Sequence, residues 1–221
     1  MTRTAPFRVF RTVLFSAVLV VPVSVFGQVS RSGSRYVAAS SGAVAAEGEV
    51  VRIRKLRGLS AQDKIRTPNY QTDLTGPTKP AKEWVNISVS YDTYPEIIEE
   101  LTFRFYVLAG KRVAGSPAPA YTFYQANVTY LDIEAGRGHE GSVLLRPPAL
   151  KLHGDLIALA VEVYHKGEVV GQESDGPRDF AADWWKKVDQ PGVTARAGYL
   201  LPRSQTPFAF VNPDDYEYAR P

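Results

Sequence analysis

The chain has 221 residues, enough for one domain with extensions, and it contains no cysteine. Disulfide bonds, thiolate catalysis and cysteine-based metal sites are therefore excluded. Of its 26 basic residues, three lie in the first 27 positions, which leaves 23 basic against 23 acidic residues in the rest of the chain. This neutral balance gives no general attraction to nucleic acid or to anionic lipid.

The first 27 residues have the layout of a secretory signal peptide. Arg3, Arg8 and Arg11 form a basic start, the run 13–26 is apolar, and Gly27 suits the last position before a cleavage site. The apolar run is short for a membrane span of about 20 residues, so cleavage is favoured over an uncleaved anchor. We therefore predict export across the inner membrane to the periplasm or cell envelope, with membrane contact only through an uncleaved signal.

A linker and then a basic strand are expected next. Residues 28–46 are rich in Ser, Gly and Ala, which predicts a disordered linker, and residues 47–221 are expected to form one domain. The segment 49–59 alternates as a strand does, and it contains four basic side chains: Arg52, Arg54, Lys55 and Arg57. Such a run is more often the solvated face of an edge strand than a patch for an acidic partner.

Further strands follow a long loop over residues 60–80. Alternating apolar residues predict them in the ranges 82–91, 101–108, 121–134 and 142–146. The apolar parity changes within the third of these strands, because Leu131 and Ile133 belong to the face opposite Tyr124 and Tyr130. This change predicts either a β-bulge or a strand that passes from one sheet to the other.

The segment Asp155–Gln172 predicts a hairpin in the core of the domain. Its first half is apolar on both faces, which indicates a strand in the middle of a packed sheet. His165–Glu168 then predicts a tight turn in which Gly167 is free to take a positive φ. This hairpin is expected to lie at the centre of an all-β domain.

The remaining segments complete the predicted fold. The glycine-rich run 136–141 predicts a turn, and 176–190 contains the expected helical turn, with Trp184 and Trp185 as a plug that closes one end of the sandwich. The last strands are expected over 199–202 and 207–211. The fold class is therefore all-β, an immunoglobulin-like antiparallel β-sandwich of about seven to nine strands with one short helix.

No catalytic, cofactor or metal site is predicted. The run 136–141 matches GxGxxG, but the residues after it favour a strand where a dinucleotide site needs a helix. His139, His153 and His165 lack metal-ligand spacing, and His139 and His165 are expected to be solvated turn residues. The chain has no nucleophile signature, and we expect no pocket with convergent polar groups, so it is predicted not to be an enzyme.

The aromatic side chains leave two interpretations open. The relevant residues are Trp84, Tyr91, Tyr94, Tyr106, Tyr121, Tyr124, Trp184 and Trp185. They suit a platform for sugars or for a partner protein, but the core of a β-sandwich also uses such residues, and that is the more frequent outcome. Trp84 differs from the others because it lies on the polar parity of its strand.

Four segments, spread over about residues 82–218, carry a family resemblance. They are Glu83-Trp84-Val85 with Tyr94-Pro95, Glu100-Leu101-Thr102-Phe103, Trp184-Trp185, and Arg203-Ser204-Gln205-Thr206-Pro207-Phe208-Ala209-Phe210. These segments resemble a family of small secreted proteins of Verrucomicrobia, the phylum of Akkermansia, whose genes lie beside type IV pilus-assembly genes. The resemblance implies an immunoglobulin-like β-sandwich, a role around the pilus or cell envelope, and no catalysis. It implies no particular binding residues.

The sequence therefore predicts a non-enzymatic, secreted or envelope-associated domain that contacts other proteins, with pilus-assembly components as the expected partners. The candidate contact residues are Arg52, Arg54, Lys55, Arg57 and Trp84. An edge strand at this position can also accept a strand from a partner. The alternative is a carbohydrate-binding module that presents exposed aromatic side chains to glycans. No cofactor, metal or nucleic acid is expected.

Overall fold

The computed structural model of the protein describes residues 49–68, 80–116, 119–189 and 192–220. The predicted signal peptide and linker, 1–27 and 28–46, lie outside the described residues. The described part forms two β-sheets packed face to face, so the prediction of an all-β sandwich is confirmed. In this part of the chain, no helix is long and apolar enough to span a membrane.

The first sheet is antiparallel and has the strand order β1-β3-β6-β10, with β2 pairing beside β1 on the same edge of β3. Its strands have the following bounds: β1 Val51–Arg57, β2 Lys64–Arg66, β3 Glu83–Thr93, β6 Gly136–Leu145 and β10 Leu200–Pro202. The segment predicted as a loop over 60–80 thus contains a short strand. The prediction of a turn over the glycine-rich run 136–141 is also wrong, because this run forms the first part of β6 and pairs with β3.

The second sheet has the order β11-β5-β4-β7-β8, and β9 lies parallel to the first part of β5. Its strands are β4 Ile98–Lys111, β5 Ala120–Ile133, β7 Asp155–His165, β8 Glu168–Asp175, β9 Val193–Ala195 and β11 Tyr218–Ala219. Eleven strands are therefore present in the described residues, more than the seven to nine predicted. Seven of them are longer than three residues, and the additional ones are short segments that pair at sheet edges.

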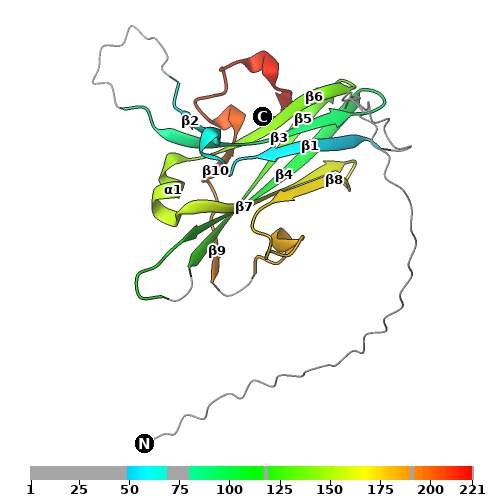
Figure 1. The fold of residues 1–221 in the computed structure, drawn as a ribbon. Coiled ribbons are helices and arrows are strands. Elements are labelled where there is room, and N and C mark those ends of the chain that lie inside the picture. The colour runs from blue at the N-terminus through cyan, green and yellow to red at the C-terminus, as the bar shows by residue number, and fades with distance from the viewer. Residues whose placement is uncertain (1–48, 69–79, 117–118, 190–191, 221) are drawn as a thin grey trace, which may run out of the picture. The chain divides into compact units, whose positions relative to one another are not determined.

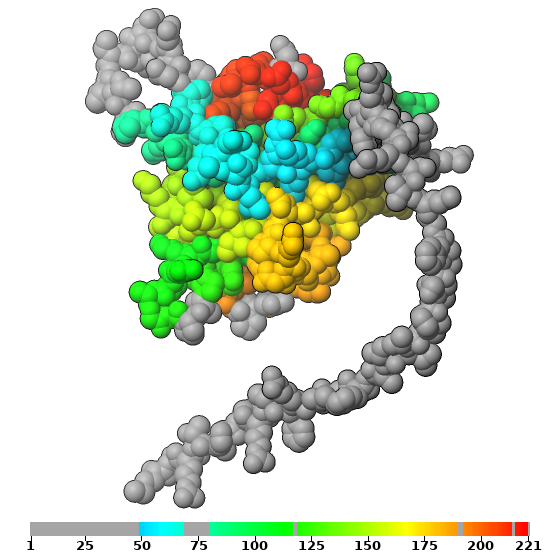
Figure 2. All heavy atoms as spheres, viewed as in Figure 1, coloured from blue at the N-terminus to red at the C-terminus, as the bar shows by residue number. Residues whose placement is uncertain are grey.

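The two sides of the sandwich differ. On one side the chain passes from β9 in the second sheet to β10 in the first, and so connects the two sheets. On the other side β1 and β8 each pair with one neighbour only, and the sheets meet where Ile53 approaches Gly171. Figure 1 shows β1 lying alongside β8, and the same neighbourhood is visible in the space-filling view of Figure 2.

The central hairpin forms as predicted, and the backbone of its turn explains why a glycine stands at position 167. β7 lies between β4 and β8, and its apolar face enters the core between the sheets. Lys166 and Gly167 both have positive φ, 49° and 87°, which is the backbone of a two-residue type I′ turn. The returning strand β8 differs from expectation because it is a largely exposed edge strand.

A second apolar cluster covers part of the outer face of the second sheet. The chain after β8 folds back and places Trp185, only 4% exposed, against Tyr106, Phe123 and Ala160. This contact explains why the first half of β7 is apolar on both faces. Trp185 is a plug as predicted, but it covers the face of a sheet and does not close an end of the sandwich.

The one α-helix in the described residues, α1, runs from Pro147 to His153, where the sequence predicted only the end of a strand. A proline is tolerated in the first helical turn, because its missing N–H has no partner there. Gly154 ends the helix at a φ of 88°, and a Cβ there would lie 2.2 Å from the carbonyl oxygen of Gly110. The short 3₁₀ turns are Ala61–Asp63, Trp184–Lys186, Arg203–Gln205 and Pro213–Asp215.

The predicted irregularity in the strand 121–134 is real but differs in form. β5 stays in one sheet and pairs with β4 in an unbroken register. Asp132 has a φ of 54°, and this left-handed residue turns Ile133 back into the core, while Leu131 stays half-buried. The parity had suggested that Leu131 and Ile133 share a face, and the structure shows that they do not.

Candidate binding sites

The predicted basic residues lie on an edge strand, and two of them are engaged within the domain. Arg54 donates to the buried carboxylate of Asp92, with Nε 2.7 Å from Oδ2. Asp92 also accepts a hydrogen bond from the backbone N–H of Gly138 at 3.1 Å. Burial by itself raises the pKa of Asp92, but the bonds from Arg54 and Gly138 outweigh it and lower the pKa below its usual value.

The other basic residues of β1 have less fixed surroundings. Arg52 pairs with Glu49, and its guanidinium lies 5.7 Å from the centroid of the Tyr94 ring. Lys55 and Arg57 are exposed. The interpretation of a charged edge strand therefore fits β1 better than a basic patch built for a partner, because Arg52 and Arg54 already pair with carboxylates of the domain.

Trp84 lies at the start of β3 and is half-buried. Its Nε1 donates to the hydroxyl of Thr67 at 3.1 Å, and its ring meets the buried ring of Phe208 edge to face at 5.9 Å. The side chain is therefore anchored by its neighbours, and it forms one wall of a groove.

This groove, called here the β2–α1 groove, consists of two adjoining hollows of about 1080 and 730 Å³. Both hollows are lined by Pro80, Ala81, Lys82, Pro147 and Pro148. Leucines from α1 line the larger hollow, and Trp84 lines the smaller one. Five cationic side chains surround the groove against two acidic ones: Lys64, Arg66, Lys82, Arg146 and Lys151 against Glu83 and Asp155.

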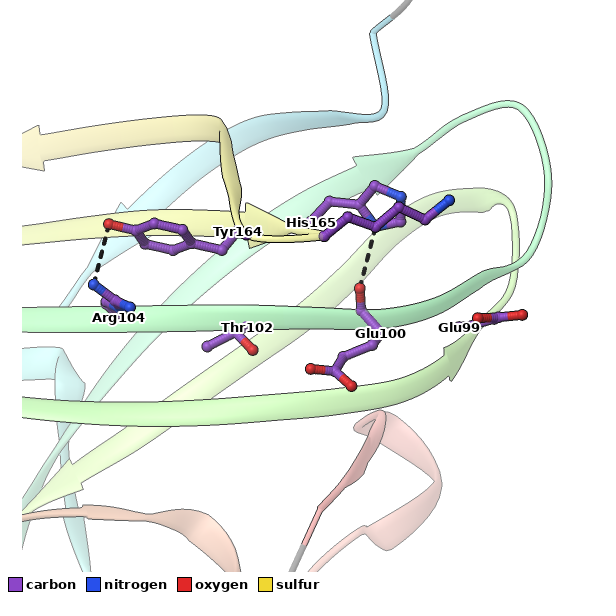
Figure 3. Close-up of a pocket in the computed structure, with 8 residues that line it drawn as sticks. Glu99, Glu100, Thr102, Arg104, Tyr164 and His165 are labelled. Carbon is purple, nitrogen blue, oxygen red and sulfur yellow. Dashed lines mark hydrogen bonds between the residues drawn. The ribbon is translucent and has the colours of Figure 1, made fainter.

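A second site, called here the polar hollow, lies on the outer face of the second sheet and has a volume of about 420 Å³ (Figure 3). Its lining consists of polar residues and one glycine: Glu99, Glu100, Thr102, Arg104, Tyr164, His165, Lys166 and Gly167. The expectation that no pocket with convergent polar groups would be found is therefore wrong. No single sequence motif contains this set, because one side comes from β4 and the other from the end of β7 and the β7–β8 turn.

Arg104 and Tyr164 form one end of the polar hollow, as Figure 3 shows. The guanidinium carbon of Arg104 lies 4.2 Å from the centroid of the Tyr164 ring. Nη1 of Arg104 donates weakly to the Tyr164 hydroxyl at 3.4 Å, whereas its Nε is buried without a hydrogen-bond partner. At the other end, Nδ1 of His165 lies 3.2 Å from the carbonyl oxygen of Glu100.

Glu162 separates the polar hollow from the Trp185 cluster. Its carboxylate is 4% exposed and accepts hydrogen bonds from Tyr106 and Tyr164 at 2.8 Å and from Trp185 at 3.0 Å. Lys186 adds an ion pair at 3.3 Å. Burial would raise the pKa of Glu162, but these donors outweigh it and lower the pKa to about 2, so the carboxylate is charged at neutral pH.

His139 differs from the solvated turn residue that the sequence predicted, whereas His165 does lie beside the β7–β8 turn, although it is half-buried. His139 is half-buried in β6, with Nδ1 2.5 Å from Glu217 and Nε2 3.1 Å from the hydroxyl of Thr93. This arrangement has the order of a Glu–His–Thr triad, but Thr93 is 1% exposed and its hydroxyl donates to the carbonyl of Glu134. The hydroxyl is therefore out of reach of a substrate, and the network attaches the C-terminal segment to the sandwich.

His153 in α1 is also half-buried, and its Nδ1 lies 2.5 Å from the hydroxyl of the buried Tyr124. Burial lowers the pKa of His153, and Arg196 and Lys111 lower it further, so the imidazole is neutral at neutral pH. Among the described residues, no three histidine or carboxylate side chains converge in a way that would hold a metal ion.

Comparison with known proteins places the fold in a family. No curated protein matches the chain. A crystal structure of a protein from Akkermansia muciniphila matches with a TM-score of 0.63 and 23% identity, over 78% of this chain and 94% of that one. At this identity the likeness shows the fold, and it agrees with the resemblance to Akkermansia-type proteins. A family model matches residues 42–220, so the chain belongs to the family that this model defines.

Proposed function

We propose that the chain is a non-enzymatic, exported domain that binds other proteins in the cell envelope, with pilus-assembly proteins as its partners. The β2–α1 groove is the observation that carries this proposal. Its prolines, leucines and Trp84 offer an apolar surface, and its rim is mainly cationic. A surface of this composition suits a peptide segment with both apolar and acidic side chains.

The cations of the groove are available for such a partner. Lys64, Arg66, Lys82 and Lys151 are exposed, and none of them forms an ion pair with another residue that the structure describes. Trp84 contributes a half-buried aromatic wall that is already ordered by Thr67 and Phe208. Binding to a pre-ordered side chain costs little conformational entropy.

A crosslinking pull-down tests the proposal. The domain Gln28–Pro221 is exposed to envelope extract of its host and the captured proteins are identified by mass spectrometry. We expect enrichment of pilus-assembly proteins, and loss of that enrichment when Lys82 and Lys151 are both changed to Glu. The control is the double change Arg112→Glu and Arg178→Glu, which reverses two exposed charges outside the groove. Recovery of no pilus component by the unchanged domain would contradict the proposal.

Saccharide binding is a second candidate function, and the polar hollow is the observation that favours it. The aromatic platform that the sequence left open as an alternative has less support, because Trp185 is buried and Trp84 and Trp184 are half-buried. The polar hollow instead supplies hydroxyl, carboxylate and guanidinium groups that form hydrogen bonds to sugar hydroxyls. Isothermal titration with oligosaccharides checks this candidate, and an absence of heat across a panel of neutral and acidic sugars would contradict it.

A further inference from the structure

We propose that the polar hollow is an anion-binding subsite in which Arg104 takes the carboxylate of an acidic saccharide. This inference rests on the saccharide-binding candidate. It specifies in addition that the ligand is an anion and that Arg104 recognises its charge. It is carried by the state of Arg104, by the ion pairs of Glu162 and Glu100, and by the absence of aliphatic side chains from the lining of the hollow.

Two acidic side chains near Arg104 already have cationic partners, and Glu99, which also lines the hollow, lies beyond ion-pair distance of Arg104. Glu162 is matched by Lys186, and Glu100 forms an ion pair with Arg220 at 2.6 Å. No carboxylate of the described residues lies within ion-pair distance of the Arg104 guanidinium. Arg104 therefore enters the hollow as a cation without a partner of opposite charge.

The guanidinium of Arg104 is also held in place. Tyr164 supports its face at 4.2 Å, and the hydroxyl of Tyr164 is fixed in turn by the carboxylate of Glu162 at 2.8 Å. Arginine presents a planar set of donors that matches a carboxylate, and a fixed guanidinium loses little freedom on binding. The Nε atom of Arg104 is buried without a hydrogen-bond partner, so the fold leaves one donor of this guanidinium unsatisfied.

The rest of the lining favours a sugar over an apolar peptide. No aliphatic side chain lines the hollow, so an apolar residue of a peptide finds no contact there. Thr102, Glu99 and the imidazole of His165 offer acceptors and donors for ring hydroxyls. A volume of about 420 Å³ lies within the range of small-ligand sites, and lies well below that of the β2–α1 groove.

The test is a titration of the domain with digalacturonate and with its neutral counterpart galactobiose, followed by calorimetry and NMR. We expect digalacturonate to bind, and to bind roughly tenfold or more tightly than galactobiose, because a charge-assisted bond to Arg104 is made only by the acid. The variant Arg104→Met keeps an unbranched apolar stem and removes the guanidinium with its charge, so it should abolish that preference. Arg112→Met, at an exposed arginine outside the hollow, should leave it unchanged.

Each other outcome overturns the inference in a distinguishable way. Equal binding of both sugars, unaffected by Arg104→Met, would leave saccharide binding in place and remove the anion subsite. Binding of neither sugar would remove both. Displacement of digalacturonate by tetraglutamate at equal concentration would show that the hollow reads any carboxylate, so that the sugar class is wrong. Thermal unfolding of both variants confirms that they are folded.

Discussion

The outer face of the second sheet has two halves, and they differ although the same strands form them. Toward one end, Tyr106, Phe123 and Ala160 are covered by Trp185. Toward the other end, Thr102, Arg104 and Tyr164 face an open hollow. Glu162 lies at the boundary, and its carboxylate bonds residues from both halves. The covered half therefore contributes to stability, whereas the open half is free for a ligand.

The largest expected effect on stability comes from removing Trp185, the side chain that covers one half of this face. Trp185→Ala removes a buried indole and leaves Glu162 without one of its donors, so the free energy of unfolding should fall by about 3–5 kcal/mol. Chemical denaturation measures this loss. Trp184→Ala is the control, since Trp184 is half-buried and should cost less. A loss below about 1 kcal/mol for Trp185→Ala would show that the cluster is not part of the core.

Glu162, at the boundary between the two halves, should make the free energy of unfolding depend on pH in the acid range. The pKa of Glu162 is lowered to about 2 in the folded protein, below the ordinary value of 4.5. Because the folded pKa is depressed, the stabilisation is present above about pH 4.5 and is lost as pH falls toward 2. The loss amounts to about 3 kcal/mol at most. Denaturant unfolding at a series of pH values measures it.

Glu162→Gln provides the matched comparison for this pH dependence. The amide keeps the shape of the side chain and has no charge to titrate, so the variant should be less stable at pH 7 and show a shallower decline below pH 4.5. Equal slopes for the two proteins would show that other carboxylates cause the acid sensitivity. Asp92, whose pKa is also lowered, is one such carboxylate.

The parts of this fold that follow local patterns could be predicted from the sequence. Period-two alternation identified the long strands, and Gly167 identified the hairpin turn, because a type I′ turn needs positive φ. The edge position of β1 followed from its charges. The helix α1 was missed because Pro147 and Pro148 suggest an end of regular structure, although proline is equally suited to the start of a helix.

The candidate sites could not be predicted, because they depend on strand register and on long-range contacts. Arg104 and Tyr164 are 60 positions apart and meet only through the pairing of β4 with β7. In the sequence, Glu162 is only a polar residue that interrupts an apolar strand. Its four donors come from three segments of the chain. The sequence singled out Trp84 by its polar parity, but its contact with Phe208 depends on the C-terminal segment folding back.

A smaller effect is expected for Tyr164→Phe, which changes only the boundary. The variant loses one hydrogen bond to Glu162 and the weak bond from Arg104, and it keeps the ring beneath the guanidinium. The free energy of unfolding should fall by about 1 kcal/mol. Affinity for an acidic sugar should fall less than it does in Arg104→Met. A loss of binding as large as that of Arg104→Met would show that the Tyr164 hydroxyl contacts the ligand.

The smallest effect on stability is expected in the open half. Arg104→Met removes a cation that has no carboxylate partner among the described residues, and it retains apolar contact with the Tyr164 ring. The free energy of unfolding should therefore change by less than about 1 kcal/mol. Denaturant unfolding of Arg104→Met and Arg112→Met, measured side by side, checks this. A loss of several kcal/mol would mean that Arg104 balances the buried charge of Glu162 at a distance. The open half would then be structural, and Arg104 would not be a free cation for a ligand.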